Sequence, residues 1–191
     1  VLLSENNEEL LNLIDLQSFI DFFIINELSK NPDGYRLSTF LNKDFNGKLK
    51  MGPIWDFNLA FANVDYCDGA NPVGWIYNFN SICPGDIWQV PFWWEVLMQK
   101  EVFKTALKNR WFSLRSSSLS NSTILYTIDS YTENLKSNKI TNQNFYIWPV
   151  LGQYIWPNFF VGSTHEEEIE FLKSWIDDRL DWMDIEINSS V

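Results

Sequence analysis

Histidine, cysteine and basic residues are scarce in this sequence of 191 residues, and each shortage argues against a class of function. His165 is the only histidine and stands near the end of the chain, so a Ser-His-Asp arrangement, a Cys-His arrangement and a zinc site are not credible. The 14 lysines and arginines are outnumbered by 25 aspartates and glutamates, which gives a net charge of −11. This charge argues against nucleic acid and anionic membranes as partners. Nucleotide is still compatible if a divalent cation neutralises the contact.

Long apolar runs and glycine-rich phosphate loops are also absent from the sequence. A membrane-spanning helix needs roughly 18 or more consecutive apolar residues. The stretch at residues 19–25 is shorter than this and contains Asp21, so no transmembrane segment is predicted. The chain starts at Val1 without a basic-then-apolar leader, and we expect that upstream sequence is missing.

The two cysteines, Cys67 and Cys83, lie in a stretch rich in glycine, proline and asparagine. One disulfide in an oxidising compartment and two free thiols both fit this pattern. Aromatic residues, by contrast, are abundant at 17% of the chain, with ten tryptophans. Residues such as Trp88 and Trp94 could stack against a sugar, but aromatic residues at helical spacing favour a core.

Hydrophobic periodicity predicts one mainly helical unit with a small β-hairpin, an α+β fold class dominated by helix. Helices are predicted over residues 5–30, 92–99, 101–117, 121–138 and 142–150, and from an N-cap at Thr164 toward Met183, with Glu167 completing a capping box. The hairpin is predicted with arms at residues 35–43 and 48–55 around a turn at residues 44–47. Residues 56–90 are predicted to be a long irregular connection, and such loops are often functional.

Two aspartates flank the predicted hairpin and should converge at its base. With the turn centred near residue 45 or 46, Tyr35 falls opposite Asp56, and Asp33 lies just beyond that pair, so the two carboxylates come within about 10 Å. Convergent carboxylates repel each other unless a cation is present, and Mg²⁺ favours such oxygen ligands while keeping positions for phosphate. Asn58 would add an amide oxygen to this site, and Asn63 could do the same. The alternative is that the two aspartates only end a helix and cap a turn.

The motifs around these aspartates resemble the spore coat protein H (CotH) kinase family, and the resemblance covers most of the chain. Residues 20–21, 26–28, 110–115 and 175–184 fit the family pattern. The segments that carry the resemblance are Asn31-Pro32-Asp33-Gly34-Tyr35, Leu41-Asn42-Lys43-Asp44 and the run from Gly47 to Phe61, with Gly52-Pro53-Ile54-Trp55-Asp56-Phe57 as the most specific part.

This resemblance implies a helical, kinase-like C-terminal lobe. Family members are similar to protein kinases in outline, are secreted or surface-associated, and use ATP and a divalent metal to phosphorylate protein. In protein kinases one aspartate orients the substrate hydroxyl, a hairpin follows, and a second aspartate holds the metal. The resemblance therefore implies that Asp33 is catalytic and that Asp56, with Asn58, binds the Mg²⁺ that accompanies ATP in the intact parent protein. It also implies an extracytoplasmic or cell-surface location, and leaves the oligomeric state open.

Three departures from the family pattern bear on activity. The amino-terminal portion that covers the nucleotide is absent, so residues 1–191 are expected to be a single C-terminal lobe with little activity alone. The family's frequent Trp-Asp-x-Asp ends here in Asn58, which removes one ligand charge. Ala62-Asn63 replaces a frequent Gly-Asn, and Ser38 stands five residues after Asp33, where protein kinases have a metal-binding asparagine. These departures predict a weak kinase or a pseudokinase.

Two alternatives come from other classes of function. The first is a non-catalytic surface module that binds glycan or protein through aromatic-rich loops. The second is a scaffold in which the aspartates have no catalytic role. Catalysis requires Asp33 and Asp56 to reach one corner, whereas binding through aromatic residues requires exposed tryptophan rings.

Overall fold

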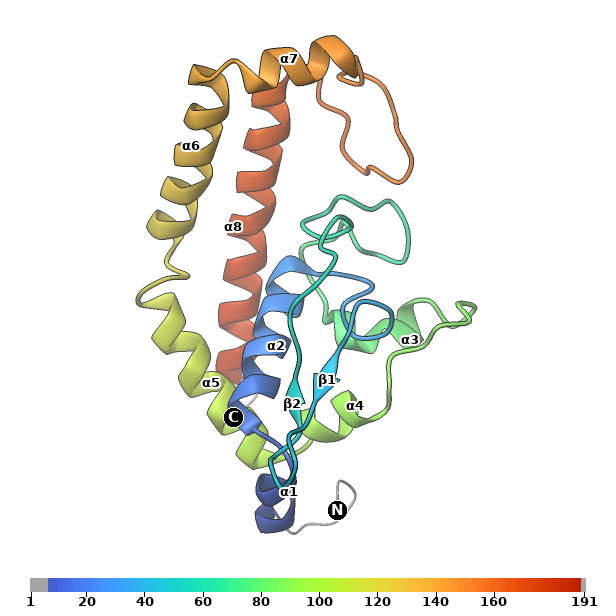
Figure 1. Ribbon diagram of the computed structural model, residues 1–191, viewed down its shortest axis with the longest axis vertical. Coiled ribbons are helices and arrows are strands. Elements are labelled where there is room, and N and C mark those ends of the chain that lie inside the picture. The colour runs from blue at the N-terminus through green and yellow to red at the C-terminus, as the bar shows by residue number, and fades with distance from the viewer. Residues whose placement is uncertain (1–6, 190–191) are drawn as a thin grey trace.

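The computed structural model describes residues 7–189, which form a mainly helical body with one small antiparallel sheet (Figure 1). This confirms the mainly α fold class with a small hairpin. The described elements are α1 (Asn7–Leu13), α2 (Leu16–Ser29), β1 (Leu41–Asn42), β2 (Lys50–Met51), the 3-10 turn η1 (Ile76–Asn78), α3 (Phe79–Ile82), α4 (Trp93–Met98), α5 (Glu101–Arg115), α6 (Asn121–Ser137), α7 (Ile140–Ile147) and α8 (His165–Ser189).

Helix α2 lies at the centre of the core and contacts α5, α8 and β2. It is apolar on most of its surface, as expected of a helix that is buried on most sides. Its Phe22 ring stacks on Trp94 of α4 with centroids 5.9 Å apart, and Tyr35 meets the same tryptophan edge-on at 4.8 Å. Trp94 is 1% exposed, which confirms its assignment to the core, whereas Trp88 is 58% exposed.

The single helix predicted over residues 5–30 is wrong, because the chain forms two helices here. The break lies at Ile14 and Asp15, where the backbone pairs with the second hairpin arm. The Asp15 N–H donates to the Leu49 carbonyl, and the Leu49 N–H donates to the Leu13 carbonyl, both at 2.8 Å. Asp15 then serves as the N-cap of α2, since its Oδ1 accepts from the Ser18 N–H at 3.0 Å. Residues 5 and 6 of the predicted helix lie outside the described residues.

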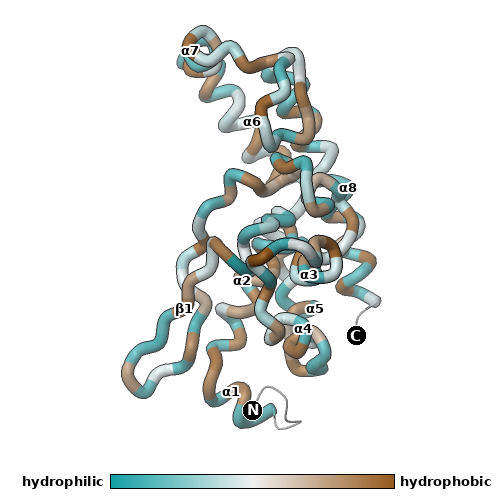
Figure 2. Tube along the Cα trace, turned by 90° about the vertical axis from the view of Figure 1, so that its right-hand side faces the viewer, coloured by the Kyte–Doolittle hydropathy of each residue, from teal (hydrophilic) through white to brown (hydrophobic). Residues whose placement is uncertain are grey.

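The hairpin exists, but its arms are much shorter than predicted. Only Leu41 with Met51 and Asn42 with Lys50 are paired, so the expected pairing of Tyr35 with Asp56 is wrong. The reason is that Tyr35 belongs to the core. Its side chain is 1% exposed, its ring packs on α2 and α4, and its hydroxyl donates to the Phe23 carbonyl. Figure 2 shows the hairpin projecting from the side of the helical body.

Helices α6 (Asn121–Ser137) and α8 run side by side, and α7 lies across their far ends, so that these three helices form a long arm (Figure 1). Thr164 caps α8 as predicted, because its Oγ1 accepts from the Glu167 N–H at 3.2 Å. Helix α8 continues to Ser189, beyond the predicted end near Met183. Within residues 7–189, no helix combines the length and the apolar character needed to cross a membrane.

The connection from β2 to α4 is largely irregular, as predicted, and is fixed at several points. Cys67 and Cys83 form a disulfide, which decides a question that the sequence left open. The ammonium group of Lys30, whose side chain is fully buried, donates to Asp68 and to the carbonyls of Asn71 and Val73 at 2.7–3.1 Å. These contacts anchor the loop to the C-terminal end of α2.

Arg179 of α8 is the second buried cation that holds this connection. It pairs with Glu27 of α2 at 3.2 Å, and both side chains are fully buried. The guanidinium also donates to the carbonyls of Glu27, Pro72 and Gly74. The Glu27 carboxylate accepts from the N–H groups of η1 at Ile76 and at Tyr77. One ion pair therefore ties α2, α8 and the loop together.

Candidate functional site

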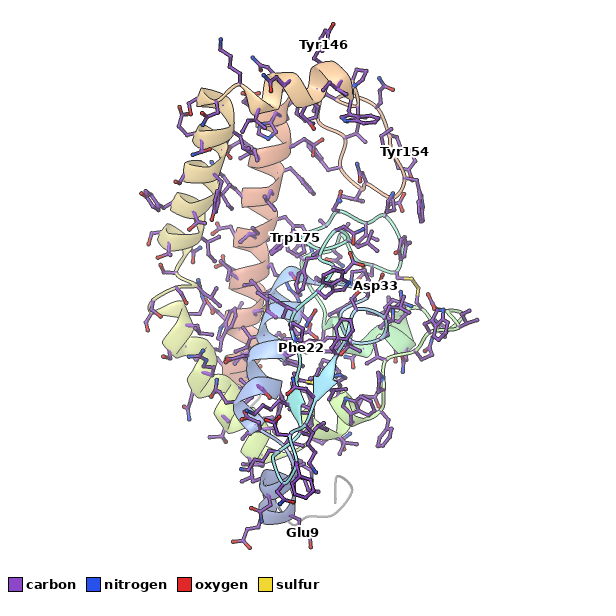
Figure 3. All side chains as sticks on the ribbon, viewed as in Figure 1. Glu9, Phe22, Asp33, Tyr146, Tyr154 and Trp175 are labelled. Atoms are coloured by element: carbon purple, nitrogen blue, oxygen red, sulfur yellow. A yellow bond between two sulfur atoms is a disulfide. The ribbon has the colours of Figure 1, made fainter. Side chains whose placement is uncertain are left out.

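Asp33 lies in a tight turn directly after α2. Lys30 ends the helix in the left-handed region with φ of 45°, and Pro32 prevents its continuation. The Asp33 carbonyl then accepts three N–H groups, from Arg36, Leu37 and Ser38, at 2.9–3.2 Å. This turn fixes the backbone of Asp33, and Figure 3 shows the residue beside the loops, on the side away from α6 in this view.

The Asp33 carboxylate is half-buried and is held by Arg36. The Arg36 Nη2 donates to Asp33 Oδ1 at 2.7 Å, while Nη1 lies 3.0 Å from a carboxylate oxygen of Asp86. The guanidinium stacks over Phe79 with 4.0 Å between its central carbon and the ring centroid, and it donates to the Trp88 carbonyl. Arg36 is therefore itself locked and orients the Asp33 carboxylate.

Asp56 lies in an unusual stretch of backbone after β2. Its φ is +62°, a left-handed value that costs a residue with a side chain roughly 1–2 kcal/mol. Phe61 and Ala62 share this conformation, with φ of 54° and 62°. Two contacts with the end of α2 hold the stretch: Asn31 Nδ2 donates to the Asp56 carbonyl, and the Phe61 N–H donates to the Ser29 carbonyl at 2.7 Å. Such retained strain is commonly found at functional sites.

The structure brings Asp33 and Asp56 into the same corner of the molecule. Burial is the main cause that raises the pKa of Asp33 above its ordinary value. Arg36 opposes this rise, whereas the charges of Asp56 and Asp86 add to it. Asp56 is exposed, and among the described residues its carboxylate has no ion-pair partner. Asn31 hydrogen-bonds to the backbones of both residues, so turns and this side chain, and not paired hairpin arms, bring the two segments together.

The other residues proposed for this site are arranged differently. Asn58 is exposed and lines a cavity of about 330 Å³ between its loop and α8. Asn63 lines the same cavity and donates its amide to the Asn58 carbonyl at 2.7 Å. Ser38 is buried in the Asp33 turn. In the part of the chain that the structure describes, no three His, Cys, Asp or Glu side chains gather into a metal-holding group.

The raised pKa of Asp33 predicts a pH-dependent difference in stability between Asp33→Asn and the wild type. The stability from protonated Asp33 is fully present below its unfolded pKa, about 3.9, and is lost as the pH rises through the higher folded pKa. Asparagine does not titrate, so the melting temperature of Asp33→Asn minus that of the wild type should increase as the pH rises from below 4 toward neutral. Differential scanning fluorimetry measures this difference, and a constant or falling difference would contradict the burial argument.

Sequence reasoning missed three groups of this site. Arg36 stands three residues after Asp33, a spacing at which opposite charges meet in turns and helices, so its pairing was detectable. Asn31 precedes Asp33 by two residues, which is the spacing of an Asx-turn. Asp86 comes from 53 positions further along the chain (86 − 33) through an irregular loop, and no local pattern indicated it.

Comparison with known proteins adds one finding. The sequence model of the family described as CotH kinase protein matches residues 3–183 of the chain. No curated protein and no solved structure matches it. The family match includes both aspartates, the turn and loop that carry them, and most of α8.

Proposed function

Because this chain belongs to the CotH kinase protein family, we propose that it supplies the carboxylate half of a phosphoryl-transfer site, with Asp33 and Asp56 in its two principal roles. A kinase family implies ATP as the phosphoryl donor and nucleotide as a ligand. The single observation that carries the proposal is that one buried side chain, Asn31, hydrogen-bonds to the backbones of both Asp33 and Asp56, which places these two separate segments side by side. Two carboxylates repel each other, so placing them in one corner is unfavourable unless a cation neutralises them.

Asp33 is proposed to orient the hydroxyl of a protein substrate and to accept its proton. A catalytic base works best when its pKa approaches the working pH, and burial raises the pKa of Asp33 in this direction. The bond from Arg36 Nη2 fixes one carboxylate oxygen, Oδ1, which leaves the other oxygen for the substrate. Arg36 is thus proposed as a positioning residue for Asp33.

Asp56 is proposed to hold Mg²⁺, with Asn58 as an accessory oxygen ligand. The donor set fits this ion, since Mg²⁺ commonly takes one or two carboxylates and completes its shell with water and substrate phosphates. A cage of three or more acidic side chains is therefore not required. Bound Mg²⁺ and ATP would supply the reactive phosphoryl group and neutralise its charge. The exposure of Asp56 supports this role because phosphate oxygens must reach the ion.

Residues 1–191 are proposed to form the C-terminal lobe of a larger kinase domain. The chain contains no glycine-rich phosphate loop, so another part of the protein would cover the nucleotide. An extracytoplasmic or cell-surface location is proposed as well, and the Cys67–Cys83 disulfide supports it, because disulfides persist in oxidising compartments.

The test is transfer of labelled γ-phosphate from ATP by the protein that contains this chain, with itself and casein as acceptors. The wild type should transfer phosphate with Mg²⁺ present, and both Asp33→Ala and Asp56→Ala should lose transfer. Equal signals from all three proteins would refute the proposal. Absence of transfer by the wild type would also refute the proposed activity and would favour a pseudokinase.

A second candidate function rests on exposed aromatic rings in α7 and in the loop that follows it. Tyr146, Trp148 and Trp156 are 89%, 65% and 70% exposed, and such rings suit a non-catalytic module that binds glycan or protein. Under this alternative, a Trp148→Ala plus Trp156→Ala variant would lose binding on a glycan array, whereas Asp33→Ala would retain it.

A further inference from the structure

Asn31 is the one described side chain with hydrogen bonds to the backbones of both Asp33 and Asp56. It is fully buried, directly after the left-handed residue that ends α2. Its Oδ1 accepts from the Asp33 N–H at 3.2 Å, and its Nδ2 donates to the Asp56 carbonyl at 3.3 Å. The first bond is an Asx-turn within the same loop, and the second spans 25 positions of the chain.

The backbone of Asn31 is held as firmly as its side chain. Its N–H donates to the Asn26 carbonyl at 3.1 Å, in the last turn of α2, and its carbonyl accepts from the Gly34 N–H at 3.2 Å. The amide is therefore a fixed link between a rigid helix end and the left-handed backbone at Asp56, whose φ is +62°. An unusual conformation of this kind persists only where surrounding contacts determine it.

We infer that Asn31 is a positioning residue that sets the separation of the Asp33 and Asp56 carboxylates. This inference rests on the proposed function, because it gives a catalytic meaning to a distance between two backbone segments. Loss of the amide removes one of the two bonds that hold the Asp56 segment to the end of α2, while both carboxylates stay in the protein. A displacement of about 1 Å at a reacting group can cost about 100-fold in rate.

Asn80, which is partly buried, provides a control for the loss of an amide side chain that clamps the backbone. Its Nδ2 donates to the Val90 carbonyl at 2.9 Å, and its Oδ1 accepts from the Val90 N–H at 2.7 Å. It thus makes the same two kinds of bond as Asn31, yet contacts neither aspartate segment. Asn31→Asp is a second variant: it keeps the acceptor for the Asp33 N–H and replaces the donor to the Asp56 carbonyl.

The experiment measures kcat, KM and Mg²⁺ dependence of phosphate transfer, together with amide hydrogen exchange, in the full protein. For Asn31→Ala we expect kcat to fall about 10–100-fold, a higher Mg²⁺ requirement, and faster exchange at residues 54–58. Asn31→Asp should share the faster exchange at residues 54–58. For Asn80→Ala we expect kcat within about twofold of the wild type and unchanged exchange at those residues, even where both alanine variants lose similar thermal stability.

Two results would overturn the inference. The first is that Asn31→Ala shows a normal kcat and a normal Mg²⁺ dependence. This result counts if the wild type transfers phosphate and the Asp56→Asn variant does not. The second is unchanged exchange at residues 54–58 in Asn31→Ala, which needs no activity to be observed. If the wild type transfers no phosphate, the proposed function fails separately, and the exchange result still decides whether Asn31 sets the position of the Asp56 segment.

Discussion

Asp56→Asn is expected to lower phosphate transfer by at least about 100-fold at limiting Mg²⁺, and this loss should shrink as Mg²⁺ is raised. A bound metal contributes several kcal/mol to the stabilisation of charge in the transition state, and 1.36 kcal/mol corresponds to about tenfold in rate. Asparagine keeps an oxygen at the same place but removes the negative charge, so the affinity for Mg²⁺ falls while the shape of the site is kept. Rates measured over a series of Mg²⁺ concentrations give the apparent metal affinity.

Asp33→Asn should behave differently in the same measurement. Removing a general base costs typically 10²–10⁴-fold, and this loss should persist at saturating Mg²⁺ because Asp33 is not proposed to hold the metal. The carboxamide keeps the shape of the side chain and can still meet Arg36 through its oxygen. If Mg²⁺ restores Asp33→Asn as well as Asp56→Asn, or restores neither, the assignment of separate roles to the two aspartates is wrong.

Arg179→Met is expected to destabilise the fold by about 3–5 kcal/mol, the usual cost of breaking a buried ion pair by removing one partner. Burial raises the pKa of Glu27 despite its neighbour, and it lowers the pKa of Arg179 to about 10. Desolvation therefore opposes the charged state of both partners. Without Arg179, the Glu27 carboxylate stays buried without its ion-pair partner, and the carbonyls of Pro72 and Gly74 lose the donor that Arg179 supplies. Denaturant unfolding monitored by tryptophan fluorescence measures the loss.

Arg110→Met is the matched control for this prediction. Arg110 also pairs with an acidic residue of α2, Asp21, at 2.8 Å, but the two side chains are 38% and 42% exposed. Exposed ion pairs contribute about 0–1 kcal/mol, so this variant should unfold close to the wild type. If Arg110→Met and Arg179→Met lower the free energy of unfolding by similar amounts, burial does not determine how much the Glu27–Arg179 pair contributes to stability.

Much of the fold was predictable because local chemistry agrees with tertiary packing. The Thr164 cap of α8 and the long irregular connection after β2 followed from the sequence. The break between α1 and α2 did not, because it depends on backbone bonds between Asp15 and Leu49, which lie on separate elements. The length of the paired hairpin arms was overestimated. Tyr35 has a side chain that favours strands, but it is buried against Trp94 in the core.

The candidate site was predicted in part, and partly for the wrong reason. Hairpin geometry predicted that Asp33 and Asp56 approach each other, and the family resemblance predicted their roles. The expected pairing of long arms was wrong, because only two residue pairs form the hairpin. The contact depends on Asn31, whose side chain reaches across 25 positions, and on a left-handed residue that is not glycine. Neither feature has a periodic signature. Asp86, the second partner of Arg36, likewise comes from an irregular loop held by a disulfide and buried cations.

The most direct test of the shared corner is paramagnetic broadening of backbone amide signals by substoichiometric Mn²⁺ in the presence of ATP. If Asp56 holds the cation in the corner that it shares with Asp33, the signals of residues 31–36 and 54–58 should broaden together before those of other acidic segments, and Asp56→Asn should remove both effects. Broadening spread evenly over the acidic surface, or a pattern unchanged in Asp56→Asn, would contradict a metal site at Asp56 beside Asp33.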